Sequence, residues 1–333
     1  MIEGRRCVKV SGIWMENIKR YGLSNYKKVD NKGKIPLYCC SIYGIYEIPE
    51  KNRIGYYKKN GAMLAAKTDA DLRELLAADI LEEIGIPHAE IIPVYDEKNS
   101  VNGCISVNIL DDDEEFISVD DNIVPALSLD DFINRELDDM SNLSNVTPEL
   151  LEKRRKYVIQ YLFLSALLSN ADLKRDNIKL IHNVKNGSYR NAEYYDSGIA
   201  FVENRTFLED LYAKDLLVEL YKKYPKEIYL LAENVVDKLT PSKVKQIMSN
   251  GIYNGFEENT KSDIERNLND RVAFISRNND IIKNKIENEE EISIEEIEEI
   301  SKDVDISLKM KIKNKLMKLK NKMIKDKDDD KIK

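Results

Sequence analysis

The stretch SNADLKRDNIKLIHNVKNGSYRNAEYYDSGIAF, residues 169–201, decides the fold of this 333-residue chain. It predicts a loop, a short apolar strand, a hairpin turn at 183–188 and a second strand that ends in an acid. Asp172 and Asn177 bracket the loop, and the hairpin is expected to return Asp196 beside them. Phosphoryl transfer requires such groups: a carboxylate for the acceptor hydroxyl, and a carboxylate and an amide for Mg²⁺.

The loop Asp172-Leu173-Lys174-Arg175-Asp176-Asn177 resembles the protein-kinase catalytic loop D-L-K-x-x-N, and Asp196-Ser197-Gly198 stands where such kinases carry D-F-G. Asn170 and the missing His-Arg pair before the loop are similar to the HipA-type kinases, and within them to the stand-alone CtkA-like branch. HipA-type members usually read D-x-H-x-x-N, so Lys174 departs from them toward the eukaryotic pattern. The departure leaves the metal ligands unchanged and alters the group nearest the γ-phosphate.

The resemblance implies a role for each residue of the loop. Asp172 would orient the acceptor hydroxyl, and Lys174 would offset charge on the γ-phosphoryl group. Asn177 and Asp196 would ligate Mg²⁺. The resemblance extends over residues 35–285, and it is clearest between Asp172 and Asp196.

A strand over 35–46 and a second over 53–58 are rich in aromatic and β-branched residues. In a kinase small lobe such a strand carries the lysine that holds the α- and β-phosphates. Period-2 alternation favours Lys58, and a slip of one residue would exchange it for Lys59. A helix follows over 68–85, and its Glu74 is expected to pair with Lys58.

Two more strands are predicted over 89–95 and 103–110, and the second leads into the linker between lobes. The resemblance implies that backbone groups around Asn108 and Leu110 pair with adenine. The sequence contains no convincing G-x-G-x-x-G, so the loop that covers the phosphates stays unassigned.

The rest of the chain is predicted to be helical. Thr147-Pro148 opens a long apolar helix that reaches 169 and delivers the loop from a rigid base. The expected fold is α+β and bilobal, protein-kinase-like, with a small β-rich lobe that carries one main helix and a larger helical lobe. The expected domains are an extension (1–35), a small nucleotide-binding lobe (36–113), a large catalytic lobe (114–285) and a charged helical or disordered tail (286–333).

Composition excludes several other classes of protein. The net charge of −8 argues against general nucleic-acid binding. Two histidines disfavour a His-based zinc site or a Ser-His-Asp triad, and four cysteines without metal spacing predict reduced thiols in a cytoplasmic protein. The lysine-rich Leu308–Ile324 segment forms an amphipathic stripe, which would lie on an anionic membrane, bind a partner, fold on the acidic segment before it, or remain solvated.

The expected function is transfer of phosphoryl groups from ATP with Mg²⁺, as a HipA- or CtkA-like Ser/Thr protein kinase that phosphorylates a protein substrate, the chain itself included. Two alternatives stay open. One is a small-molecule kinase that resembles aminoglycoside phosphotransferases, which use a similar Asp, Asn and Asp set. The other is a pseudokinase or scaffold, which the absent glycine loop and the charged tail favour.

Overall fold

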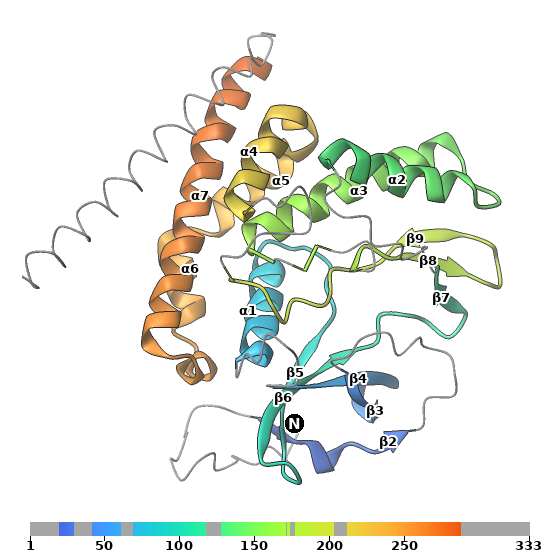
Figure 1. Cartoon of the computed structure of the whole chain (residues 1–333), viewed down its shortest axis with the longest axis vertical. Coiled ribbons are helices and arrows are strands. Elements are labelled where there is room, and N and C mark those ends of the chain that lie inside the picture. The colour runs from blue at the N-terminus through green and yellow to red at the C-terminus, as the bar shows by residue number, and fades with distance from the viewer. Residues whose placement is uncertain are drawn as a thin grey trace, which may run out of the picture.

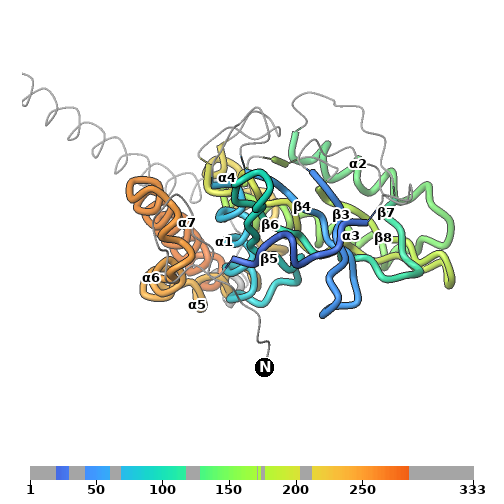
Figure 2. The backbone as a smooth tube through the Cα atoms, turned by 90° about the horizontal axis from the view of Figure 1, so that it is seen from below, coloured from blue at the N-terminus to red at the C-terminus, as the bar shows by residue number. Residues whose placement is uncertain are grey.

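The computed structural model describes residues 20–29, 42–60, 69–117, 128–170, 172–173, 177–202 and 212–287. The described chain has a β-sheet part and a helical part, and helix α1 (Ala70–Glu83) stands between them (Figure 1). Seen from below in Figure 2, helices α6 (Pro241–Met248) and α7 (Glu258–Glu287) lie on one side of α1. On the other side lie α2 (Leu129–Ser141), β7 (Glu114–Phe116) and β8 (Leu180–Asn183).

Six described strands form one sheet in the order β1-β5-β6-β4-β3-β2. Neighbouring strands are antiparallel, except for β1 and β5, which run parallel. An added Cβ on Gly103 of β6 would lie 2.4 Å from the carbonyl oxygen of Lys58, so glycine permits the close approach of β6 to β4 there. The strands are β1 (Tyr21–Gly22), β2 (Lys28–Val29), β3 (Ile42–Ile48), β4 (Arg53–Lys59), β5 (Ile91–Asp96) and β6 (Val101–Val107).

Side chains of β4 alternate between the apolar core of the sheet and the opposite face. Tyr57 is buried in the apolar core of the sheet, together with Ile48, Ile105 and Val107. Successive side chains of a strand point to opposite faces, so Lys58 points away from this core. The predicted strands correspond to β3 to β6 with displaced ends, and residues 35–41 of the first lie outside the described residues.

Helix α3 is the central helix of the helical part. Its N-cap Thr147 accepts a hydrogen bond from the Leu150 N–H at 3.2 Å, and Pro148 occupies the first turn, as the sequence predicts. The helix is buried almost all round from Val158 onward, so its C-terminal end is a rigid base for the loop that follows. The other helices are α2 (Leu129–Ser141), α4 (Ala213–Lys223), α5 (Pro225–Lys238), α6 (Pro241–Met248) and α7 (Glu258–Glu287), and α3 itself spans Pro148–Leu167.

Helix α1 packs into the core of the helical part. Its buried Leu72, Leu76 and Ile80 belong to one apolar cluster with residues of α3, α4, α5 and α7. The Tyr253 hydroxyl donates to Asp79 at 2.5 Å, which fixes the outer turns of α1 to the segment after α6. Movement of α1 away from the helical part would therefore expose apolar surface and break this contact.

A smaller sheet of β7 (Glu114–Phe116), β8 (Leu180–Asn183) and β9 (Tyr189–Asn191) contains the predicted hairpin. Its second strand ends earlier than the sequence predicts. Tyr194 turns away from β8 and pairs with the exit of α1: its N–H donates to the Pro87 carbonyl at 3.0 Å, and its carbonyl accepts from the Ala89 N–H at 2.8 Å. This pairing carries Asp196 toward α1 instead of along β8.

None of the described helices combines the length and the apolar character needed to cross a bilayer. The amphipathic segment Leu308–Ile324, for which a membrane or partner contact is expected, lies outside the described residues.

Candidate active site

A lysine and two carboxylates from three separate elements meet beside the sheet. Lys58 Nζ on β4 lies 2.6 Å from Glu74 Oε1 on α1 and 2.9 Å from Asp196 Oδ1 after the hairpin. The side chains of Lys58 and Asp196 keep 15% and 21% exposure, whereas that of Glu74 keeps 3%. The predicted pairing of Lys58 with Glu74 is thus present, and Asp196 joins it.

The neighbouring strand residue does not take part. Lys59 Nζ lies over the Tyr43 ring, 5.7 Å from its centre, on the other face of β4. The structure therefore places Lys58, and not Lys59, against the two carboxylates.

The charges of this group depend on one another. Burial lowers the pKa of Lys58, but the carboxylates of Asp196 and Glu74 outweigh it and hold that pKa well above its ordinary value. Burial raises the pKa of Glu74 against the opposing effect of the Lys58 ammonium. Lys58 is accordingly protonated at neutral pH.

The Cys104 thiol lies behind the pair, opposite Lys58 across β4 and β6. Its Sγ donates to Glu74 Oε2 at 3.8 Å, so both oxygens of this carboxylate have partners. Burial, with the Glu74 charge, holds the pKa of Cys104 well above its ordinary value, which keeps it a thiol donor. The sequence did not single out Cys104 for this role.

The loop after α3 brings two of its predicted residues together. Asn177 Nδ2 donates to the backbone carbonyl of Asp172 at 2.8 Å, so its side-chain oxygen is the atom suited to ligate a cation. Asn170 Oδ1 accepts from the Asp172 N–H at 3.3 Å and braces the loop from its other end. The remaining predicted catalytic residue, Lys174, lies outside the described residues.

Tyr194 connects this loop to the segment that carries Asp196. Its hydroxyl accepts from Asn170 Nδ2 at 3.3 Å and lies 2.9 Å from Ser165 Oγ on α3. Its ring stacks on Tyr161, with centroids 4.6 Å apart. Asn170 therefore contacts both the Asp172 backbone and Tyr194, which lies two positions before Asp196. The sequence did not identify Tyr194 or Ser165. A serine within the apolar stretch at the end of α3 is a signal that could have indicated a buried hydrogen bond.

Asp196 adopts an unusual backbone conformation, with φ of 60°. Aspartate tolerates this left-handed region better than most residues, and such conformations gather at functional sites. Gly198 follows two residues later, where an added Cβ would lie 3.5 Å from Glu74 Oε2. The Asp-Ser-Gly turn thus packs directly against the α1 carboxylate.

Two arginines that the sequence did not identify hold these segments in place. Arg73 on α1 donates to the backbone carbonyls of Ala200 and Phe201, each at 3.0 Å, and so fixes the chain just beyond Asp196. Arg154 on α3 is buried, pairs with Glu136 at 2.5 Å, and donates to the Ile178 carbonyl at 2.6 Å, next to Asn177. Buried guanidinium groups need such multiple partners.

The α1 helix is also tied to the sheet by a buried polar cluster. Arg20 and Asn60 both donate to the Asp71 carboxylate, and the Asp71 N–H donates back to Asn60 Oδ1 at 3.0 Å. All three side chains are buried. Asp71 lies one turn before Glu74 on the same helix. The cluster therefore fixes the position of Glu74 relative to Lys58 on β4.

The side-chain oxygens of Asn177 and Asp196 suit a Mg²⁺ ion that is bound together with a nucleotide. Mg²⁺ prefers oxygen ligands and commonly takes one or two protein groups, with phosphate oxygens and water completing its shell. Asn177 and Asp196 offer an amide and a carboxylate oxygen. In the described part of the chain no group of three or more His, Cys, Asp or Glu side chains could hold a metal by itself.

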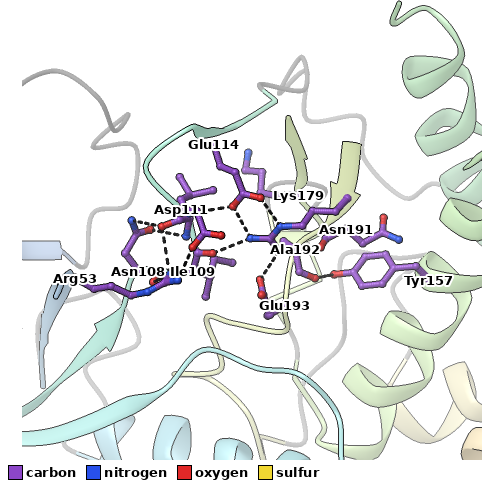
Figure 3. A network of polar contacts seen from close by, with 12 residues as sticks. Arg53, Asn108, Ile109, Asp111, Glu114, Tyr157, Lys179, Asn191, Ala192 and Glu193 are labelled. Atoms are coloured by element: carbon purple, nitrogen blue, oxygen red, sulfur yellow. Dashed lines mark hydrogen bonds and ion pairs between the residues drawn. The ribbon is translucent and has the colours of Figure 1, made fainter. Parts of the chain in front are cut away.

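The linker between the lobes has its own polar network, shown in Figure 3. Arg53 donates to the carbonyl of Asn108 at 2.8 Å and of Leu110 at 3.3 Å, and pairs with Asp111 at 2.5 Å. The Asn108 N–H donates to the Ile54 carbonyl at 2.9 Å. The backbone groups of Asn108 and Leu110, predicted to meet adenine, therefore have partners within the chain.

A cavity of about 460 Å³ lies against the same linker. Its lining includes Arg53, His88, Asn108, Arg190 and Glu193, and none of Lys58, Glu74 or Asp196. This cavity is therefore distinct from the place where the lysine and the two carboxylates meet.

No protein-family model matches the chain, and no curated protein matches it in sequence. Solved structures match it in fold. The crystal structure of the Helicobacter pylori proinflammatory kinase CtkA has a TM-score of 0.56 and 13% identity, and the match covers 76% of this chain and 94% of that chain. The chain thus has a bilobal, kinase-like α+β fold, as the sequence predicts, whereas membership of the HipA-type family stays a prediction.

Two further matches have lower scores. One is HipA in its complex with HipB and operator DNA from Shewanella oneidensis MR-1, with a TM-score of 0.45, 12% identity, and coverage of 80% of this chain and 71% of that chain. The other is the Golgi casein kinase, with a TM-score of 0.43, 9% identity, and coverage of 81% and 74%.

Proposed function

We propose that this chain is a phosphotransferase that moves the γ-phosphoryl group of Mg-ATP to a hydroxyl of a protein serine or threonine, its own residues included. The observation that carries the proposal is the position of Lys58 Nζ, which contacts Glu74 at 2.6 Å and Asp196 at 2.9 Å. Kinases require a strand lysine paired with a helix glutamate, together with a metal-binding aspartate. The kinase-like fold supports the same reading.

Each of these residues has a proposed role in the transfer. Lys58, held by Glu74, would bind the α- and β-phosphates, while Asn177 and Asp196 would hold Mg²⁺. The metal, when bound, neutralises charge on the β- and γ-phosphates. Asp172 would accept the proton of the acceptor hydroxyl as that oxygen forms a bond to the γ-phosphorus. The bond from the γ-phosphorus to the β–γ bridging oxygen breaks, and ADP leaves.

Lys174 is proposed to offset charge on the transferred phosphoryl group, because its place in the loop matches D-L-K-x-x-N. The described residues of the loop are held by hydrogen bonds. Asn170 and Asn177 brace it at the Asp172 backbone, and Arg154 holds the chain beyond it. Preorganisation of this kind is how enzymes obtain most of their electrostatic catalysis.

Incubation of the purified chain with Mg-ATP, followed by mapping of phosphorylated residues by mass spectrometry, tests the proposal. We expect phosphoserine or phosphothreonine on the chain or on an added general protein substrate, and none with Asp172→Asn. ATP consumption only after a metabolite such as an aminoglycoside is added would instead identify a small-molecule kinase. Mg-ATP at a hundred times its Kd should raise the free energy of unfolding by about 2.7 kcal/mol; no rise and no product would indicate a pseudokinase.

A further inference from the structure

The C-terminal half of α1 is held by polar contacts from the helical part. Tyr253 lies in the short helical turn Gly251–Gly255 that follows α6, and its hydroxyl donates to Asp79 at 2.5 Å. Asn234 of α5 donates to the Ile84 carbonyl, just after the last turn of α1, also at 2.5 Å. Two separate elements of the helical part therefore fix the same end of α1.

The Tyr253 contact is a buried one. The Tyr253 side chain is 0% exposed and belongs to the same apolar cluster as Leu72 and Leu76 of α1. Its ring stacks on Phe256, with centroids 6.0 Å apart, so packing holds the ring independently of the hydroxyl. Burial raises the pKa of Asp79, and the hydrogen bond from Tyr253 opposes that rise. Loss of the hydroxyl would leave this carboxylate without its donor, which is more costly than loss of a surface contact.

The opposite face of α1 carries the proposed phosphate-binding pair. At 3.6 residues per turn, Leu72 and Asp79 lie on one side of α1, and Glu74 projects from the other side. Glu74 contacts Lys58 Nζ at 2.6 Å. The helix thus stands between the Tyr253 contact and the strand lysine, in keeping with its place between the sheet and the C-terminal helices in Figure 1.

The segment that carries Asp196 is attached to the same helix. Arg73, next to Glu74, donates to the carbonyls of Ala200 and Phe201, each at 3.0 Å. A helix transmits a displacement along its length because its backbone is rigid. A shift of α1 would therefore displace both carboxylates that contact the strand lysine.

We propose that Tyr253 is a positioning residue for phosphoryl transfer, which acts through Asp79 to hold α1 where Glu74 meets Lys58. The inference rests on the proposed function, and it adds that the C-terminal part of the chain aligns the nucleotide site from outside the lysine–carboxylate group. Alignment matters because a misplacement of about 1 Å can lower an enzymatic rate by about a hundredfold.

The test is a double-mutant cycle, measured as kcat/KM for Mg-ATP with phosphate incorporated into the chain or into a general protein substrate. Tyr253→Phe keeps the ring and removes the hydroxyl, and it should lower kcat/KM by about tenfold. In Glu74→Gln the carboxylate that α1 supplies to Lys58 is already lost, so adding Tyr253→Phe should cost less than about twofold. Loss of folded protein alone would lower the rate by the same factor in both backgrounds.

The matched control is Tyr221→Phe. Tyr221 is also fully buried in the helical part, but its hydroxyl donates to the Ile275 carbonyl of α7, at 3.4 Å, instead of to α1. This variant should leave kcat/KM nearly unchanged, and the melting temperatures of both tyrosine variants show how much stability each has lost. Asn234→Ala removes the other contact to α1 and should show the same dependence on Glu74, so it decides the question if Tyr253→Phe does not fold.

The possible failures are distinguishable. Unchanged kcat/KM in folded Tyr253→Phe and Asn234→Ala would overturn the inference and leave the proposed function intact. An equal loss with and without Glu74→Gln would also overturn it, since Tyr253 would then only stabilise the fold. Absence of transfer by the unaltered chain would remove the proposed function and the inference together.

Discussion

Asp196→Ala should abolish transfer of the γ-phosphoryl group while the chain remains folded. Asp196 is the proposed carboxylate ligand of Mg²⁺ and also contacts Lys58 Nζ at 2.9 Å, so its loss would remove that ligand and one of the two carboxylates that position Lys58. Single electrostatic groups in phosphoryl transfer are worth about 10³-fold or more in rate. We expect a fall in kcat of at least this size, measured as phosphate incorporated from Mg-ATP per minute.

The matched control is Asp237→Ala, at an exposed aspartate of α5, which should retain full activity. The circular dichroism spectrum and the melting temperature show whether each variant is folded. Asp196 has φ of 60°, which alanine adopts less readily, so Asp196→Asn should be tested alongside. If a folded Asp196 variant transferred phosphate at the original rate, the metal assignment would be wrong.

Lys58→Met should lower kcat/KM for Mg-ATP by about a hundredfold or more, since a preorganised cation of this kind is worth 10²–10³. It should also destabilise the fold, because Glu74 is left buried beside Asp196 with no cation between them. Removing one partner of a buried pair costs about 3–5 kcal/mol, and protonation of Glu74 reduces that cost. Chemical denaturation with matched activity assays measures both effects.

The pH dependence of Lys58→Met separates its two effects. Burial already holds the folded-state pKa of Glu74 above its ordinary value, and loss of Lys58 raises it further. The folded state then binds a proton more tightly than the unfolded state, so stability falls as pH rises through this window. The deficit in unfolding free energy should be smaller near about pH 5 than near about pH 8.

Lys59→Met is the matched control, since Lys59 lies over the Tyr43 ring on the opposite face of β4. It should leave kcat/KM nearly unchanged and show no pH-dependent deficit. Equal losses in the two variants, or a larger loss in Lys59→Met, would reverse the assignment of the phosphate-binding lysine.

The parts of the fold predicted from sequence are those with strong local signals. Thr147-Pro148 predicts where α3 begins, and the alternation of β4 favours Lys58 over Lys59. The lysine and Glu74, 16 positions apart, were paired through the resemblance to kinases. Local patterns and that resemblance together were sufficient to predict the start of α3 and the pairing of Lys58 with Glu74, because each element involved is regular.

The parts not predicted depend on contacts between distant segments. The second hairpin strand ends at Asn191 because Tyr194 pairs with the exit of α1, and no local pattern records that partner. Arg154 looks like one of several charged residues on a helix, yet it is buried against Glu136 and the loop after Asn177. Arg53 likewise reads as the first residue of a strand, and its role appears only when the linker carbonyls are placed beside it.

The most direct measurement is a crystal structure of the chain with Mg²⁺ and a non-hydrolysable ATP analogue. We expect Lys58 Nζ within hydrogen-bond distance of the α- or β-phosphate, and a metal ion bound by the side-chain oxygens of Asn177 and Asp196. A nucleotide whose phosphates lie away from Lys58, with Lys58 still contacting only Glu74 and Asp196, would contradict the account.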